Sequence, residues 1–221
     1  MNDIFQIDSP LMRGLSRITD LMALNVLWLL CCLPLITAGA STSAMYSVLF
    51  RQQLGLEDAV IRPFFRAFRE NLKQGIILWL PGLIGIALLV FDGLFLYSMV
   101  TNFLHPLWLV FYVVAFLILS YCSFFPAVIA RYHCQTRHVF GTCISLCCLN
   151  PIAAISVVVL NLVVPLCVLF LPEFVYKTLP LWLFFGSVLP AFLNSVTFLR
   201  VFSKYADEPK ETSELSEASD S

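Results

Sequence analysis

Five long apolar runs, separated by short polar stretches, restrict the fold of this chain more than any other feature. The runs cover residues 21–40, 76–99, 107–130, 151–171 and 181–201. Each is close to the roughly 20 residues that an α-helix needs to cross about 30 Å of hydrocarbon. Only 12% of the residues are charged, whereas about 25% are charged in soluble domains. The pattern therefore predicts an all-α fold, a polytopic membrane helix bundle of about five transmembrane helices.

The basic residues alternate with these runs. Ten of the 13 Lys and Arg residues lie after the first, third and fifth runs. Because cytoplasmic loops carry the Lys/Arg excess, we predict an N-terminus outside and a cytoplasmic C-terminus. Ala38-Gly39-Ala40 also resembles a signal-peptide cleavage site. Cleavage there would place five of the ten basic residues outside, so we favour an uncleaved first helix. A single membrane domain would cover residues 1–205, and the acidic residues 206–221 would form a disordered tail.

Residues 61–74 predict a cytoplasmic amphipathic arm. Apolar residues recur there at the spacing of one helix face, and basic residues occupy the other face. Such a helix lies at the membrane surface and attracts anionic lipid. It either serves only as an anchor or also contacts a partner. The candidate residues for lipid or partner binding are Arg62, Phe64, Arg66, Phe68, Arg69 and Lys73.

A few polar side chains fall inside the apolar runs. Asp92 is the acid placed well inside a run, and an intramembrane carboxylate is a candidate functional group. Each run also contains a proline, which would bend the helix and free a carbonyl. Asn161 lies four residues before Pro165, and Asn194 lies four residues after Pro190. We therefore take Asp92, Asn161 and Asn194 as a candidate intramembrane polar site, although plain packing would explain them as well.

The fourth run is preceded by a second apolar segment, residues 139–149. Asn150-Pro151 should break the helix between the two, because a residue before proline avoids the helical region. We expect residues 139–149 to form an interfacial amphipathic helix and residues 151–171 to cross the membrane. Whether residues 139–149 instead belong to the fourth span stays open.

Signatures of enzymes, metal sites and nucleic-acid binding are missing from the sequence. There is no Gly-rich phosphate loop, no H-E-x-x-H and no G-x-S-x-G. Most of the eight cysteines lie in or beside apolar runs, where a thiol behaves as a small hydrophobe. One mixed cluster matches no standard zinc spacing: His133, Cys134, His138 and Cys143. We therefore expect no catalytic residues, no cofactor, no metal and no nucleic-acid partner.

Several passages resemble the YesL family of small bacterial integral membrane proteins. The shared features are the apolar-Asn-x-x-Trp-Leu run at Leu24–Leu29, the Leu33-Pro34 pair, the Gly39–Thr42 element and the RPFFRAFRENLKQG passage. The family has no established biochemical activity. Its members are commonly encoded beside carbohydrate-uptake transporters and glycan-utilisation enzymes. The resemblance thus implies an accessory role in sugar uptake at the bacterial cytoplasmic membrane.

Two hypotheses follow for the function. The first is a non-enzymatic accessory or regulatory protein whose arm at residues 61–74 contacts a carbohydrate transporter subunit. The second is a small solute transporter that uses Asp92 and proline-kinked helices to line a path. The lipid bilayer is a partner in both, and neither fixes the ligand or the oligomeric state.

Overall fold

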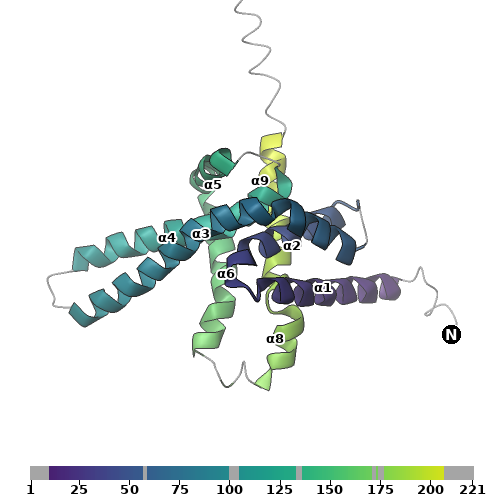
Figure 1. The fold of residues 1–221 in the computed structure, drawn as a ribbon, viewed down its shortest axis with the longest axis horizontal. Helices are drawn as coiled ribbons and strands as arrows, with labels where there is room; N and C mark the ends of the chain where they lie inside the picture. The colour runs from purple at the N-terminus through teal and green to yellow at the C-terminus, as the bar shows by residue number, and fades with distance from the viewer. Residues whose placement is uncertain are drawn as a thin grey trace, which may run out of the picture.

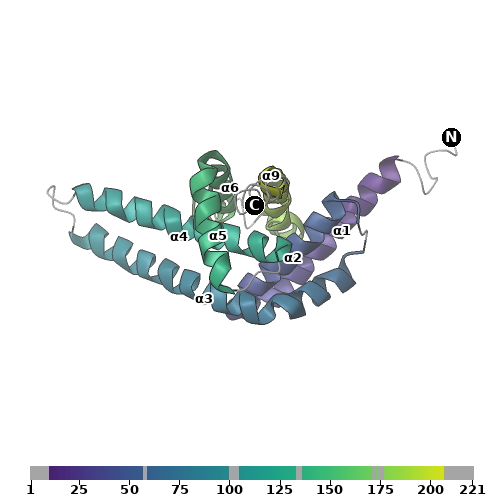
Figure 2. The same ribbon diagram turned by 90° about the horizontal axis from the view of Figure 1, so that it is seen from above.

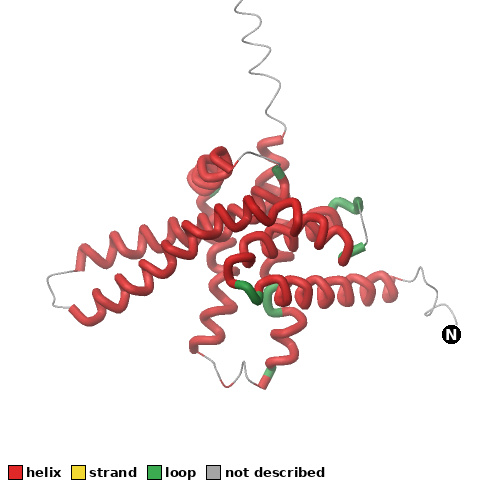
Figure 3. Tube along the Cα trace, in the orientation of Figure 1, coloured by secondary structure: helices red, strands yellow, loops and turns green. Residues whose placement is uncertain are grey.

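The computed structural model describes residues 10–56, 59–99, 105–132, 136–170, 173 and 177–206. Within these ranges the chain is helical, with short breaks and no strand (Figure 3). The elements are α1 (Pro10–Cys32), η2 (Leu35–Thr37), α2 (Ala38–Gln53), α3 (Ile61–Met99), α4 (His105–Arg131), α5 (Thr136–Leu149), α6 (Pro151–Phe170), α8 (Leu179–Phe185) and α9 (Val188–Ala206). The predicted all-α fold is confirmed. Of the predicted tail at 206–221, Ala206 is the last residue of α9, and the remainder lies outside the described residues.

An elbow interrupts the first apolar run. The predicted helix over residues 21–40 is wrong at its C-terminal end, because α1 stops at Cys32 and α2 begins at Ala38. Pro34 lies between them in an extended conformation, since a proline cannot donate the hydrogen bond that would continue the helix. The hydroxyl of Thr37 then donates to the carbonyl of Cys31 at 2.7 Å. The elbow thus turns the chain back while satisfying a carbonyl at the end of α1.

The central helix is α2, which packs against α1, α3, α4 and α9. Its first turns contain small residues, and these permit a very close approach to α3. A side chain on Gly75 would lie 2.7 Å from the Cα of Ala40. Small residues allow helix backbones to pack closely in membrane proteins. The Ala38-Gly39-Ala40 sequence that resembles a cleavage site is therefore part of a buried helix contact.

The predicted arm and the second predicted span form one continuous helix, α3, of 39 residues. Pro81 lies inside this helix. The hydroxyl of Tyr121 on α4 donates to the carbonyl of Leu78, three residues before the proline, at 2.8 Å. A neighbouring helix therefore supplies a hydrogen bond beside the proline, as expected for a membrane helix.

The predicted break at Asn150-Pro151 is confirmed, and α5 and α6 meet there at 106°. A second break separates α8 from α9 at Gly186 and Ser187. Pro190 lies four residues after Gly186 and cannot donate to its carbonyl. The interruption that the sequence predicts for this proline is therefore present, and Pro190 itself lies in the first turn of α9.

Asn25 of α1 joins the α8–α9 break to the rest of the bundle. It is fully buried. Its Nδ2 donates to the carbonyl of Leu183 at 2.6 Å. Its Oδ1 accepts the N–H groups of Val188 at 3.1 Å and Ser187 at 3.3 Å. One amide thus pairs backbone groups at the end of α8 and the start of α9, which have no partner within their own helices.

Aromatic rings from α2, α4 and α9 fill the core. The ring centroids of Phe124 and Phe198 are 5.0 Å apart, edge to face. Tyr46 meets Phe198 at 5.6 Å, and Phe50 meets Phe202 at 6.2 Å. Edge-to-face pairs of this kind add stability beyond the area they bury. This core fixes the position of α2 between the longer helices.

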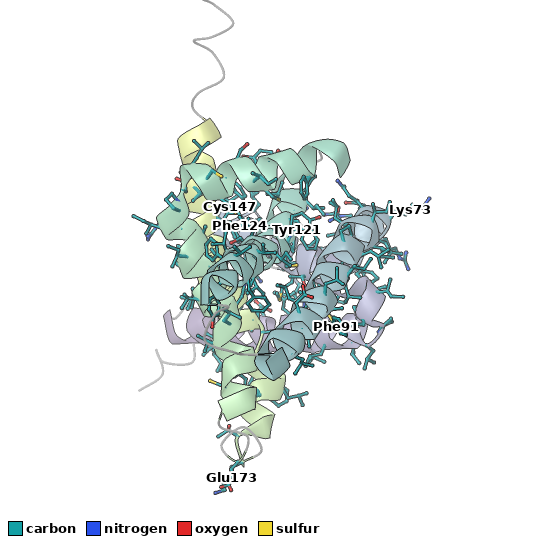
Figure 4. The ribbon with its side chains drawn as sticks, turned by 90° about the vertical axis from the view of Figure 1, so that its left-hand side faces the viewer. Lys73, Phe91, Tyr121, Phe124, Cys147 and Glu173 are labelled. Atoms are coloured by element: carbon teal, nitrogen blue, oxygen red, sulfur yellow. The ribbon has the colours of Figure 1, made fainter. Side chains whose placement is uncertain are left out.

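Three groups of helices project from the core in different directions (Figures 1 and 2). They are the α3–α4 hairpin, the N-terminal part of α1, and the α6 and α8 ends near Glu173, which Figure 4 labels at the lower tip. Large apolar side chains are exposed along all three. Within the described ranges, four helical segments are long and apolar enough to span a membrane, and five if the bent α5–α6 pair counts as one span. Helices that are long enough to cross a bilayer and that expose apolar side chains suit a lipid environment.

Candidate functional site

The structure brings together two of the three predicted intramembrane polar residues. The Nδ2 of Asn194 on α9 donates to the Oδ1 of Asn161 on α6 at 2.9 Å. Asn194 is completely buried. Its Oδ1 accepts no hydrogen bond from any described residue. A buried amide acceptor without a partner is uncommon, so this pair is an incomplete polar network.

Asp92 does not belong to that pair. It lies in the outer half of α3, where the α3–α4 hairpin has left the core (Figure 1), and its side chain is exposed. Its neighbour Phe91 is labelled in Figure 4 on the part of α3 that faces the viewer, toward the tip of the hairpin. Tyr97, Asn102 and His105 follow Asp92 toward the end of the hairpin, and their side chains are outside the described part of the structure. The three polar residues therefore do not form one site.

A cavity of about 350 Å³ lies beside the Asn161 side chain, and we call it the core cavity. Residues from α1, α2, α3, α4, α6 and the α8–α9 junction surround it. Its wall combines aromatic rings with uncharged polar groups and small apolar residues. The lining residues are Trp28, Gly39, Thr42, Met45, Tyr46, Trp79, Leu119, Cys122, Ser123, Phe125, Pro126, Asn161, Ser187, Pro190 and Ala191.

Hydrogen bonds hold several of these polar groups in place. The indole N–H of Trp28 donates to the hydroxyl of Thr42 at 3.1 Å, and that hydroxyl donates to the carbonyl of Ala38 at 2.8 Å. The hydroxyl of Ser123 donates to the carbonyl of Leu119 at 2.8 Å. The wall is thus preorganised, and each of these hydroxyl oxygens retains a lone pair.

The arm residues divide between the core and the surface. Phe64 is completely buried and stacks on Phe68 with centroids 6.3 Å apart. Phe68 is only partly buried and packs against the core. Phe64 therefore cannot contact a partner, and its assignment to a binding surface is corrected. It anchors the beginning of α3 to the rest of the protein.

The basic arm residues remain on the outside. Figure 4 shows Lys73 at the outer edge of the molecule. Two apolar side chains, Ile61 at 58% exposure and Phe65 at 42%, accompany the basic groups. Several of these residues line a shallow hollow. We define the arm surface as Ile61, Arg62, Phe65, Arg66, Arg69 and Lys73, all of which are exposed.

A pocket lined by arginines from three helices lies beside the arm, and the sequence did not predict it. Arg51 of α2, Arg66 of α3 and Arg131 of α4 line a common pocket of about 150 Å³. Glu70 and Asn71 lie in the same wall. All three arginines belong to the ten basic residues predicted to be cytoplasmic, so the charge pattern held the signal. It could not show that helices distant in sequence bring them together.

Among the described residues, no group of three or more His, Cys, Asp or Glu side chains could hold a metal ion. The seven described cysteines form no disulfide. Of the mixed cluster singled out from the sequence, only the side chain of Cys143 is described, and it is buried in the core cluster. His133 and Cys134 lie outside the described residues.

Fold and site together define a polytopic membrane helix bundle with an uncharged, mainly apolar core cavity and a basic arm surface. A protein-family profile described as "Protein of unknown function, DUF624" matches residues 21–93. The match extends from α1 through α2 into α3 and contains both Asn25 and the arm. No curated protein and no solved structure matches the chain. The profile carries no activity, and the YesL resemblance stays a prediction.

Proposed function

We propose that the protein is a non-enzymatic accessory factor of the bacterial cytoplasmic membrane that docks on a carbohydrate transporter subunit through the arm surface. The observation that carries this proposal is the division of α3 between a buried and an exposed face. Phe64 is fixed in the core, whereas Arg62, Arg69 and Lys73 are exposed. A rigid helix that presents several cations beside exposed apolar groups suits an acidic protein surface.

The same face would also attract anionic lipid, at about 1 kcal/mol per basic residue. Two features favour a protein partner. Ile61 and Phe65 are exposed beside the cations, and the hollow between them suits an inserted side chain. Interfaces are enriched in aromatic residues and arginine but depleted in lysine, and the arm surface has this composition.

The location and the link to sugars rest on the sequence. The Lys/Arg bias supports a cytoplasmic arm, and the YesL resemblance supports the connection with carbohydrate uptake. The alternative, a small solute transporter built around Asp92, loses support because Asp92 is exposed and apart from the Asn161–Asn194 pair.

The docking proposal is tested with the double variant Arg62→Gln and Arg69→Gln. The full-length protein is co-expressed with the membrane subunits of a carbohydrate transporter from the same organism, and co-purification is quantified. We expect at least a tenfold loss of the transporter subunit, because two cations of the contact are removed. Arg17→Gln is the matched control, since Arg17 is exposed on α1, and it should leave co-purification unchanged.

Membrane insertion of each variant is checked by the reactivity of an added cysteine on either side of the membrane, because loop charges also set topology. Equal co-purification of the double variant and the wild type would contradict the proposal. Loss of binding to anionic vesicles with unchanged co-purification would assign the arm surface to lipid instead.

A further inference from the structure

We infer that the core cavity binds a small, uncharged, polyhydroxylated molecule of about monosaccharide size. This goes beyond the accessory role, and it does not require the arm surface to dock. Accessory proteins of uptake systems gain a regulatory function if they bind the solute themselves. The argument rests on the charge, chemistry, size and unfinished hydrogen bonding of the cavity.

The cavity wall contains no Asp, Glu, Lys, Arg or His among its lining residues. A charged ligand placed there would lose its hydration without gaining an opposite charge, which is strongly unfavourable. The wall nevertheless offers hydroxyl groups, an amide and two indoles. It therefore suits a neutral molecule that makes hydrogen bonds.

Aromatic rings occupy several sides of the same wall. Trp28 comes from α1, Tyr46 from α2, Trp79 from α3 and Phe125 from α4. Flat apolar rings complement the C–H faces of a ligand, while hydroxyl and amide groups complement its oxygens. Sites of this kind are mainly apolar, with few fixed polar groups that orient the ligand. A sugar or polyol ring presents both kinds of surface at once.

The size also agrees. A volume of about 350 Å³ lies at the lower end of the range of about 300–1,000 Å³ for small-molecule sites. This space accommodates one monosaccharide.

The asparagine pair supplies an independent observation. Asn161 lines the cavity and uses its Oδ1 to accept from Asn194. The Oδ1 of Asn194, a fully buried residue, accepts no hydrogen bond from the described residues. Partly satisfied polar networks are unfavourable in a low-dielectric interior. A ligand hydroxyl that accepts from the Nδ2 of Asn161 would extend this network.

The test uses full-length protein in nanodiscs of zwitterionic lipid and follows tryptophan fluorescence, since Trp28 and Trp79 lie in the wall. D-glucose and D-xylose serve as neutral probes, and D-glucuronate and D-glucosamine as charged analogues. We expect a saturable change with at least one neutral probe and at least tenfold weaker binding of its charged analogue. An equal response to neutral and charged probes, or no saturable response to either neutral probe, would overturn the inference.

Two pairs of variants locate the binding. Ser123→Leu fills the cavity, whereas Ser156→Leu adds the same volume on α6 at a serine that also donates to a nearby carbonyl but does not line the cavity. Thr42→Val removes a lining hydroxyl with little change of shape. Its control is Thr19→Val, because the exposed Thr19 likewise donates to the carbonyl four residues earlier.

Ser123→Leu should abolish the response and Thr42→Val should weaken it about tenfold, while both controls behave as wild type. If Ser123→Leu fails to fold, Thr42→Val alone decides between the outcomes. A wild-type response in the folded cavity variants would overturn the inference. The inference would also be overturned if a lipid co-purified with the wild type and was lost from the cavity variants. Failure here would leave the co-purification experiment unaffected, so the two proposals are tested separately.

Discussion

Replacing Asn25 by Leu should destabilise the bundle more than any exposed polar substitution in α1. Asn25 makes three hydrogen bonds to the α8–α9 break, at 2.6, 3.1 and 3.3 Å. Leucine has a similar volume but can replace none of them. The N–H of Val188 would then be left without a partner at a buried position, and the carbonyl of Leu183 and the N–H of Ser187 at partly buried positions.

The size of the effect follows from the number of groups left without a partner. Interhelical hydrogen bonds in membrane proteins average about 0.6 kcal/mol each, which gives about 2 kcal/mol for three. A fully buried group left without a partner costs about 1–3 kcal/mol, and of the three only the N–H of Val188 makes a fully buried bond. Because the other two groups are partly accessible, we expect a total loss of about 2–4 kcal/mol in the free energy of unfolding.

Reversible unfolding in mixed dodecylmaltoside and sodium dodecyl sulfate micelles measures this change. Thr19→Val is the control, because it likewise removes a hydrogen-bonding side-chain group from α1, but at an exposed position. Its effect should stay within about 0.5 kcal/mol. If Asn25→Leu were no more destabilising than Thr19→Val, the three hydrogen bonds would not hold the α8–α9 break, and the reasoning would be refuted.

Further substitutions test the packing of α3 and α5. Gly75→Ala should destabilise the protein by about 1–3 kcal/mol, because the added methyl group would lie 2.7 Å from the Cα of Ala40. Gly141→Ala should instead be neutral or stabilise by up to about 1 kcal/mol, because no atom lies within 4 Å of the added group. Phe64→Ala should lower stability by about 3–5 kcal/mol as a fully buried ring is lost, whereas Phe65→Ala, 42% exposed, should have less than half that effect. The same micelle titration checks both pairs, and equal effects within either pair would contradict the assigned packing.

The long apolar segments were predictable because hydropathy depends on composition alone. The run at residues 107–130 corresponds to α4, which extends from His105 to Arg131. The break at Asn150-Pro151 was also predictable, since the restriction before proline is local. The break before Pro190 follows a local rule as well. The sequence could not show that Asn25, more than 150 residues away, pairs the backbone groups at the α8–α9 break.

The arm shows a different limit of sequence reasoning. Helical periodicity separated its apolar face from its basic face, and the basic residues are indeed exposed. Periodicity could not show whether the apolar face meets lipid or protein. The burial of Phe64 depends on α2, whose small residues allow close contact with α3. Likewise, the prolines singled out Asn161 and Asn194, but only the tertiary fold places them 2.9 Å apart.

The continuity of α3 has a mechanical consequence. At about 1.5 Å per residue, this 39-residue helix is about 58 Å long. The backbone contact between Gly75 and Ala40 acts as a fulcrum, with about 21 Å of helix on the side of Ile61 and about 36 Å on the side of Met99. A tilt that moves the short end by about 1 Å would move the long end by about 1.7 Å. A displacement of α3 at residue Ile61 would therefore be larger at the Met99 end of the same helix.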